Sequence, residues 1–229
     1  MAEVKVDLYP KPDFWTPSIR LHGDTGWIYS GSDTTGTEGR LILTSNKGSS
    51  EIVLASGAGP DMRSGPGPAM VMRDSSGKDS IVLDGAKGDI ILGNADCAED
   101  FDMSQSLTIE PGTVLVIDQE GKLRQSELAY DKKVAGVLSG AHDYRPGIVL
   151  DRKPSRSDRK SVSLVGKVYC KADAQYEPIE VGDLLTTSPT PGYAMKAVDP
   201  LKAFGAVIGK ALHPLTKGKA LIPILIALQ

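Results

Sequence analysis

A repeat with a fixed offset of 29 residues is the feature that most constrains the fold of the first hundred residues. Residues 41–54 read LILTSNKGSSEIVL and residues 70–83 read MVMRDSSGKDSIVL, so a glycine and the triplet IVL coincide. A second echo aligns IRLHGDTGWI (19–28) with IVLDGAKGDI (81–90). Each unit is an apolar run, a polar turn with glycine and another apolar run, which predicts short β-strands joined by tight turns.

Strands this short bury little apolar surface when the chain is alone. Period-two alternation over three to five positions gives one thin apolar row and leaves two open backbone edges. Such rows do not offset a backbone ordering cost of about 1–2 kcal/mol per residue. Winding with identical chains supplies the missing edges. We therefore predict that residues 17–93 form a trimeric β-fibre or β-prism, with an ordinary β-sandwich of accidental repetition as the alternative.

The apolar repeat rows are predicted to face the threefold axis and to form the trimer core. Between the repeats, residues 55–69 (ASGAGPDMRSGPGPA) are too rich in glycine and proline for a helix or a central strand. We expect a loop there that carries the chain from one face to the next. The predicted trimer core consists of Ile52, Leu54, Met70, Met72, Ile81, Leu83, Ile90 and Leu92.

The pattern changes to longer strands after residue 107. Turn residues recur every 8–12 positions, and no strand–helix–strand alternation suggests a nucleotide-binding fold. We predict an all-β domain over residues 94–229, resembling a barrel or a sandwich. The predicted strands lie in residues 107–118, 133–140, 146–150, 161–170, 181–188, 193–198, 203–212 and 219–228. The basic segment 151–161 between two of them is expected to be a solvated loop.

Composition excludes several classes of function. The net charge of −3 gives no general attraction to nucleic acid or to anionic membranes. No apolar signal-peptide core opens the sequence, and the longest apolar run, ALIPILIAL (220–228), is too short to span a bilayer. We therefore expect a soluble chain made in the cytosol, with no membrane insertion and no nucleic-acid partner.

Cysteine and histidine usage indicates no cofactor and no metal. Cys97 and Cys170 are too few and too far apart for a disulfide scaffold or a metal knuckle, so small buried apolar roles are favoured over pairing. Three scattered histidines do not make a metal site. The cluster SGAHD, with Ser139, His142 and Asp143, is interpreted as a polar turn because triad members normally converge from separate segments.

The acidic segment GDIILGNADCAEDFD (88–102) lies where the two patterns meet. Asp96 and Glu99 have the spacing of a helix capping box, which predicts one short capped turn packed against the second domain. The segment lacks the ligand spacing of an EF-hand calcium loop. A carboxylate pair for glycoside cleavage needs a sugar cleft, which this segment alone does not indicate.

The order of segments from residue 94 onward resembles a known family. NADCAEDF (94–101), PGTVLVID, VAGVLSG, LVGKVYC, IEVGDLLTTS and GYAMKA together resemble the C-terminal intramolecular-chaperone and autocleavage domain of phage tail spikes and neck-appendage proteins. The resemblance covers about residues 93–229. It implies a domain that drives trimer assembly behind a trimeric β-fibre or β-helix. It also implies chain cleavage before the aspartate of this motif, by a serine hydroxyl assisted by the acid three residues later.

The residues of this chain depart from that cleavage motif at one position. The cut would fall between Ala95 and Asp96, with Glu99 as the assisting acid. Alanine has no hydroxyl with which to attack its own carbonyl. We therefore predict that Asp96 and Glu99 are vestiges of the site, that the chain stays uncut and that the protein is not an enzyme.

The combined prediction is a homotrimeric spike, fibre or adaptor of a phage tail or a phage-tail-like contractile injection particle. Its other partners would be neighbouring particle proteins, and it would pass from the cytoplasm into the virion or the extracellular particle. Residues 1–16 form an N-terminal arm in which Phe14 and Trp15 either dock onto a partner or plug the first β layer. The alternatives are a self-cleaving chaperone and a protein that binds cell-surface glycans.

Overall fold

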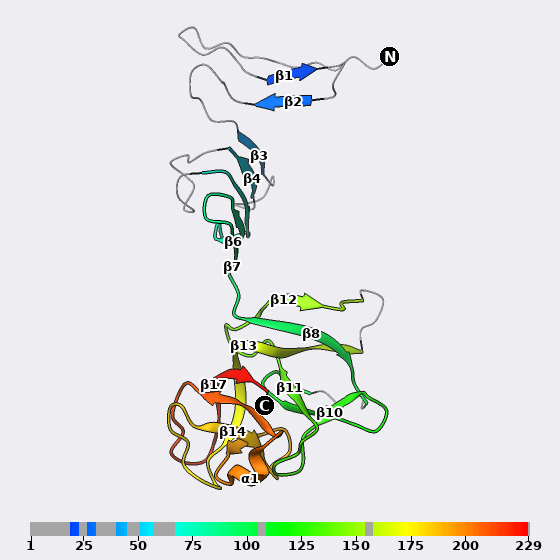
Figure 1. The fold of residues 1–229 in the computed structure, drawn as a ribbon, viewed down its shortest axis with the longest axis vertical. Coiled ribbons are helices and arrows are strands. Elements are labelled where there is room, and N and C mark those ends of the chain that lie inside the picture. Colours follow the sequence, from blue (N-terminus) through cyan, green and yellow to red (C-terminus); the bar gives the residue numbers. More distant parts are fainter. Residues whose placement is uncertain are drawn as a thin grey trace. The chain divides into compact units, whose positions relative to one another are not determined.

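The computed structural model describes residues 19–22, 27–30, 40–44, 51–56, 67–104, 109–153 and 158–228 (Figure 1). These residues form an all-β fold with a single short helix, α1 (Pro200–Ala203), so the predicted fold class is confirmed. The chain divides into two compact units, residues 1–93 and residues 94–229. No helix in the described segments is long and apolar enough to cross a membrane.

The first unit consists of antiparallel hairpins. One hairpin pairs β1 (Ile19–His22) with β2 (Trp27–Ser30). A five-stranded meander follows in the order β3-β4-β5-β6-β7. The 29-residue repeat relates the β3–β4 hairpin to the β5–β6 hairpin, and the second echo relates β1–β2 to β6–β7. The meander strands are β3 (Arg40–Thr44), β4 (Glu51–Ala55), β5 (Ala69–Arg73), β6 (Asp79–Asp84) and β7 (Asp89–Leu92).

The β5–β6 turn shows why polar residues with glycine separate the strands. The carboxylate of Asp74 accepts hydrogen bonds from the backbone N–H groups of Ser76 (2.8 Å) and Lys78 (3.1 Å). Gly77 has φ of 79°, in the left-handed region that favours glycine. The sequence DSSGK therefore reverses the chain within the turn and sets the register of the two strands.

The second unit is one ten-stranded sheet that closes on itself. Its main path is β10-β9-β11-β13-β15-β14-β16-β17, and β13 also pairs with β17 over nine residue pairs. β8 lies between β13 and the edge strand β12, which it pairs in parallel. The strands are β8 (Asp96–Asp102), β9 (Val114–Ile117), β10 (Leu123–Gln125), β11 (Val134–Leu138), β12 (Pro146–Leu150), β13 (Arg159–Asp173), β14 (Leu184–Thr187), β15 (Ala194–Lys196), β16 (Val207–Ala211) and β17 (Lys219–Ala227).

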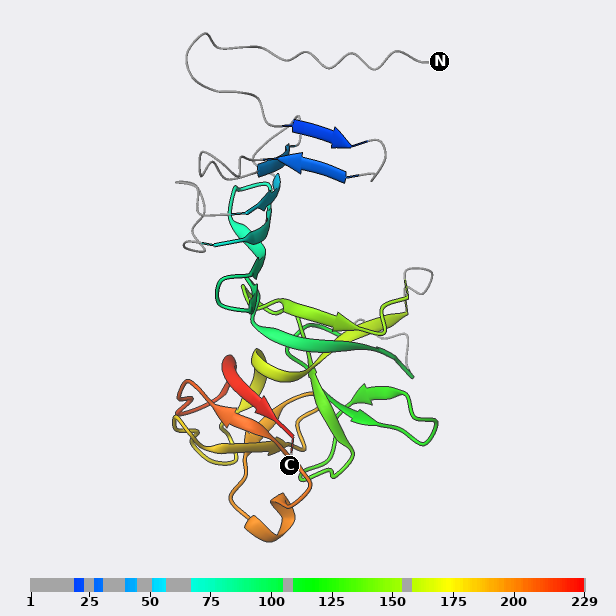
Figure 2. The same ribbon diagram turned by 45° about the horizontal axis from the view of Figure 1, so that its top comes forward.

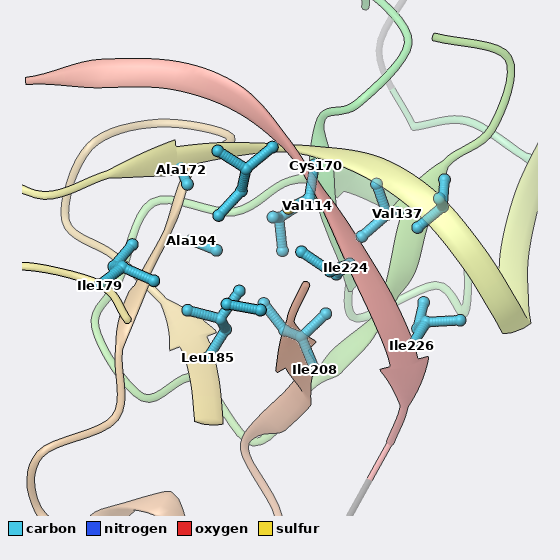
Figure 3. Packing of buried hydrophobic residues seen from close by; sticks show 13 residues of the cluster. Val114, Val137, Cys170, Ala172, Ile179, Leu185, Ala194, Ile208, Ile224 and Ile226 are labelled. Carbon is cyan, nitrogen blue, oxygen red and sulfur yellow. The ribbon is translucent and has the colours of Figure 1, made fainter. Parts of the chain in front are cut away.

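A core of aliphatic side chains fills the interior of this sheet. Figure 3 shows Leu185, Ile208 and Ile224 converging from three different strands, and all three are fully buried. β17 alternates strictly, so Ile224 points inward while Leu225 points outward. All eight segments predicted as strands in this domain contain strands. β10 and α1 were not predicted, and β8 was predicted as a capped turn.

Candidate assembly surface

Ten large aliphatic side chains lie on one face of the β3–β7 sheet, which we call the apolar face. They form two rows that run across all five strands, because each residue is the register partner of the next. None of the ten is charged and none is buried. One row is Leu41, Leu54, Met70, Leu83 and Ile90, and the other is Leu43, Ile52, Met72, Ile81 and Leu92.

On the opposite face the register row runs Ile42, Val53, Val71, Val82 and Ile91, and the two isoleucines at its ends are exposed. Val53, Val71 and Val82 are buried at its centre, where they form a cluster with Ala55. At one end Arg73 donates to Glu51 at 2.6 Å and to Asp79 at 2.8 Å, and all three side chains are largely shielded. The centre of this face is thus buried, whereas the large side chains of the apolar face are all exposed or partly exposed. An apolar patch of this size is typical of an interaction surface.

Part of the apolar face is hollowed into an open groove of about 700 Å³. Four members of one row, Leu41, Leu54, Leu83 and Ile90, line it together with residues of the β6–β7 turn. The turn is held by Asp84, whose carboxylate accepts from the backbone N–H groups of the two residues that follow Gly85. The apolar face therefore contains a groove beside a β6–β7 turn that is held by hydrogen bonds.

All eight residues predicted for the trimer core lie on the apolar face. Leu41 and Leu43 share the face and were missed, although the 29-residue offset aligns them with Met70 and Met72. The repeat was therefore a sufficient signal to identify them. That these side chains face a threefold axis remains a prediction.

The predicted capped turn at Asp96 is wrong, because residues 96–102 form strand β8. Asp96, Ala98 and Asp100 are buried while the residues between them are half-buried, which is the alternation of a strand. Backbone hydrogen bonds to strands on both sides satisfy this segment more completely than one capped turn does. A three-residue spacing on a strand places Asp96 and Glu99 on opposite faces, so the structure does not bring the two acids together.

Asp96 is a buried carboxyl group at the start of β8, only 5% exposed. The hydroxyl of Ser139 donates to its Oδ1 at 3.1 Å. Burial raises the pKa of Asp96, and the hydrogen bond from Ser139 offsets only part of this effect. The neighbouring Ala95 lies in the backbone ladder, donating to the carbonyl of Arg145 and accepting from the N–H of Lys167. The Ala95–Asp96 peptide bond, where the family motif would place the cut, therefore lies within the hydrogen-bonded sheet.

Replacing Asp96 with asparagine should remove a pH dependence rather than the fold. A carboxyl whose pKa is raised by folding stabilises the native state below its unfolded pKa, and this contribution is lost as pH rises through the folded value. The unfolding free energy of wild type minus that of Asp96→Asn should therefore be largest near pH 4 and fall as pH increases. Urea unfolding between pH 3.5 and 8 measures it, and a difference that stays constant with pH would contradict the assignment.

Asp100 and Asp102 of the segment pair with arginines of the β12–β13 connection and of the start of β13. Burial opposes ionisation of Asp100, but hydrogen bonds from Ser161 (2.6 Å) and Arg152 (3.2 Å) outweigh it and hold the pKa of Asp100 below its ordinary value. Arg159 pairs with Asp102 at 3.3 Å and with Asp151 at 2.6 Å. The expectation that segment 151–161 is a solvated loop is wrong for residues 159–161, which begin β13, and the Arg159 side chain is only 8% exposed. Within the described ranges, no three potential metal ligands gather into a group.

The remaining candidate residues from the sequence do not form a common site. Ser139 bonds Asp96, whereas the ring of His142 packs against Tyr169 with centroids 4.7 Å apart. Both cysteines are free, and complete burial raises the pKa of Cys170 to about 12. Phe14 and Trp15, the predicted docking anchor, lie outside the described residues.

Comparison with known proteins finds similar solved structures and no matching family. No family model and no curated protein matches the chain. The pre-mature bacteriophage phi29 gene product 12 aligns with a TM-score of 0.41 and 17% identity over 66% of this chain, which spans 25% of that protein. The C-terminal fragment of bacteriophage phi29 gene product 12 aligns with a TM-score of 0.40 and 18% identity over 58% of this chain and all of the fragment.

Proposed function

We propose that this protein is a structural component of a phage tail or a phage-tail-like contractile injection particle, acting as a homotrimeric spike, fibre or adaptor. The observation that carries the proposal is the apolar face, on which ten large apolar side chains of a five-stranded sheet are exposed or partly exposed and none is buried. The resemblance of residues 93–229 to tail-spike assembly domains supports a phage tail as the assembly in which this surface is used. The chain would be made in the cytoplasm and carried into the particle.

The open edges of the sheet favour three copies over two. Among the residues that the structure describes, β3 and β7 each pair with one strand of the sheet and form its two edges. β7 reads DIIL and has no proline, lysine or bulge, the usual protections of an edge strand. Two sheets stacked face to face would cover the apolar faces but leave all four edges open. A threefold ring brings each edge beside the edge of a neighbour and closes the apolar rows around one axis.

The assembly role is tested on the native particle. A tag on the full-length chain should appear at a threefold position when tail-like particles from the producing cell are imaged by electron microscopy. Particles that lack the tag, from cells that contain the tagged protein, would contradict a structural role. That result would not bear on the trimer, which is tested separately by the solution mass of the purified protein.

The chain should remain uncut on prolonged incubation, because position 95 has no hydroxyl and Glu99 lies on the face opposite Asp96. A denaturing gel should show one band at 24.3 kDa. Glu99→Ala should cost less than about 1 kcal/mol, since the side chain is partly exposed and caps no helix. Time-dependent fragments of about 10 and 14 kDa in wild type, absent in this variant, would show that the protein cleaves itself.

A further inference from the structure

The segment around α1 exposes two of its apolar side chains almost completely. Leu201 is 90% exposed and Phe204 is 82% exposed, and Val198 beside them is 58% exposed. Figure 2 shows α1 protruding from the strands of its own unit. We call Val198, Leu201 and Phe204 the apolar knob. The apolar knob contains none of the residues of the apolar face, and its proposed role does not depend on the proposed trimer.

The backbone beneath the knob is held rigidly. The carboxylate of Asp199 caps α1 by accepting from the N–H groups of Leu201 (3.0 Å) and Lys202 (3.2 Å). The hydroxyl oxygen of Tyr130 accepts from the N–H groups of Val198 (3.0 Å) and Asp199 (3.1 Å). These bonds fix the turn so that its apolar side chains point outward. Because this backbone is already ordered in the free protein, binding a partner loses less conformational entropy.

Two lysines flank the knob. Lys202 follows Leu201 in the sequence, and its pair with Asp199 (3.4 Å, lysine 68% exposed) is a surface pair that contributes little. The Lys132 side chain approaches Gly205 from the neighbouring loop, 4.0 Å from where a Cβ would stand. A partner surface that covers Leu201 and Phe204 therefore also meets positive charge at the rim.

We propose that the knob is a docking anchor for a different protein, one that offers an apolar pocket with carboxylates at its rim. A protruding anchor needs a concave receptor, and aromatic anchors in pockets dominate the affinity of many interfaces. A second knob is a poor occupant, because a phenylalanine buries about 150–250 Å² whereas stable interfaces bury about 800 Å² per partner. Two knobs meeting symmetrically would also oppose their own lysines.

Site-specific photo-crosslinking in the producing cell tests this proposal. The photoreactive residue p-benzoylphenylalanine is placed at position 204 of the full-length chain, and at Val181, which is 64% exposed elsewhere, as the matched control. Position 204 should give one adduct whose added mass differs from 24.3 kDa and whose crosslinked peptide, identified by mass spectrometry, contains both apolar and acidic residues. The control position should not give this adduct.

Two variants then separate docking from folding. With the crosslinker at 204, the pair Lys132→Glu and Lys202→Glu should lower the yield of that adduct at least about tenfold. The double variant Leu201→Ser, Phe204→Ser should keep the melting temperature and solution mass of wild type, whatever that mass is. An adduct between two copies of this chain, an adduct to lipid, no adduct, or insensitivity to the charge reversal would overturn the proposal. A changed solution mass in the serine variant would assign the knob to self-assembly instead.

Discussion

Aspartate in place of Ile81 or Leu83 is expected to convert the assembled protein into single folded chains. Both side chains lie on the apolar face, one in each of its two rows, and both are partly exposed in the isolated chain. The substitution therefore costs the single chain little. In a closed assembly it buries an unpaired carboxylate in every copy, at a cost on the order of 4 kcal/mol each, equivalent to about a thousandfold in association.

The solution mass measured by light scattering should fall to 24.3 kDa for either variant, with the circular dichroism spectrum unchanged. Leu128→Asp provides the control, because Leu128 is 60% exposed and belongs to the second unit rather than to the β3–β7 sheet. That variant should keep the mass of wild type. Aspartate variants at 81 and 83 that assemble normally would remove the apolar face from the interface.

The second large effect is expected from Ile224→Ala in the core of the second unit. Ile224 is fully buried among side chains from other strands, as Figure 3 shows, so truncation leaves a cavity. Large-to-small changes of this kind lower the free energy of unfolding by about 2–5 kcal/mol. Chemical denaturation followed by fluorescence or circular dichroism measures the loss.

The adjacent residue supplies the comparison for this prediction. Leu225 lies on the same strand but points outward and is 43% exposed, so Leu225→Ala should cost less than about 1 kcal/mol. The contrast between the two neighbours tests the register of β17 directly. Equal losses would mean either that the strand is shifted or that Leu225 is covered in the assembled protein, and the solution mass of the variant distinguishes these cases.

Much of the fold was predictable because its signals are local. Hairpins repeat at a fixed offset, and their glycines stand where the turns need a left-handed backbone, as at Gly77. Period-two alternation then identifies the face on which each side chain lies. For this reason the eight residues predicted for the trimer core share one face, and Leu41 and Leu43 follow from the same alignment.

β8 was not predictable because its stability comes from distant segments. Its acids suggest a polar turn when the sequence is considered locally. In the structure Asp100 binds Ser161 and Arg152, while Asp102 binds Arg159, all more than 50 residues away along the chain. Sequence spacing gives no indication of such pairing. The strand also runs parallel to β12, and parallel partners are never joined by a short turn that a local pattern would reveal.

The candidate surface was predicted in its residues but not in its shape. The sequence indicates that large aliphatic residues alternate, but not that the valines of the opposite face are buried within the same unit. Only the structure distinguishes the buried cluster of one face, with Val53, Val71 and Val82, from the apolar face, on which no large side chain is buried. The apolar knob had no signal of its own, because a single helical turn is too short to show periodicity.

Sedimentation equilibrium of the purified full-length protein tests the central claim most directly. The proposal predicts one species with three times the chain mass of 24.3 kDa, over a concentration range wide enough to reveal dissociation. In the proposed trimer the three copies would close the apolar faces and give every sheet edge a neighbour. A well-folded species at 24.3 kDa, or a stable dimer, would contradict the trimer and the assembly function built on it.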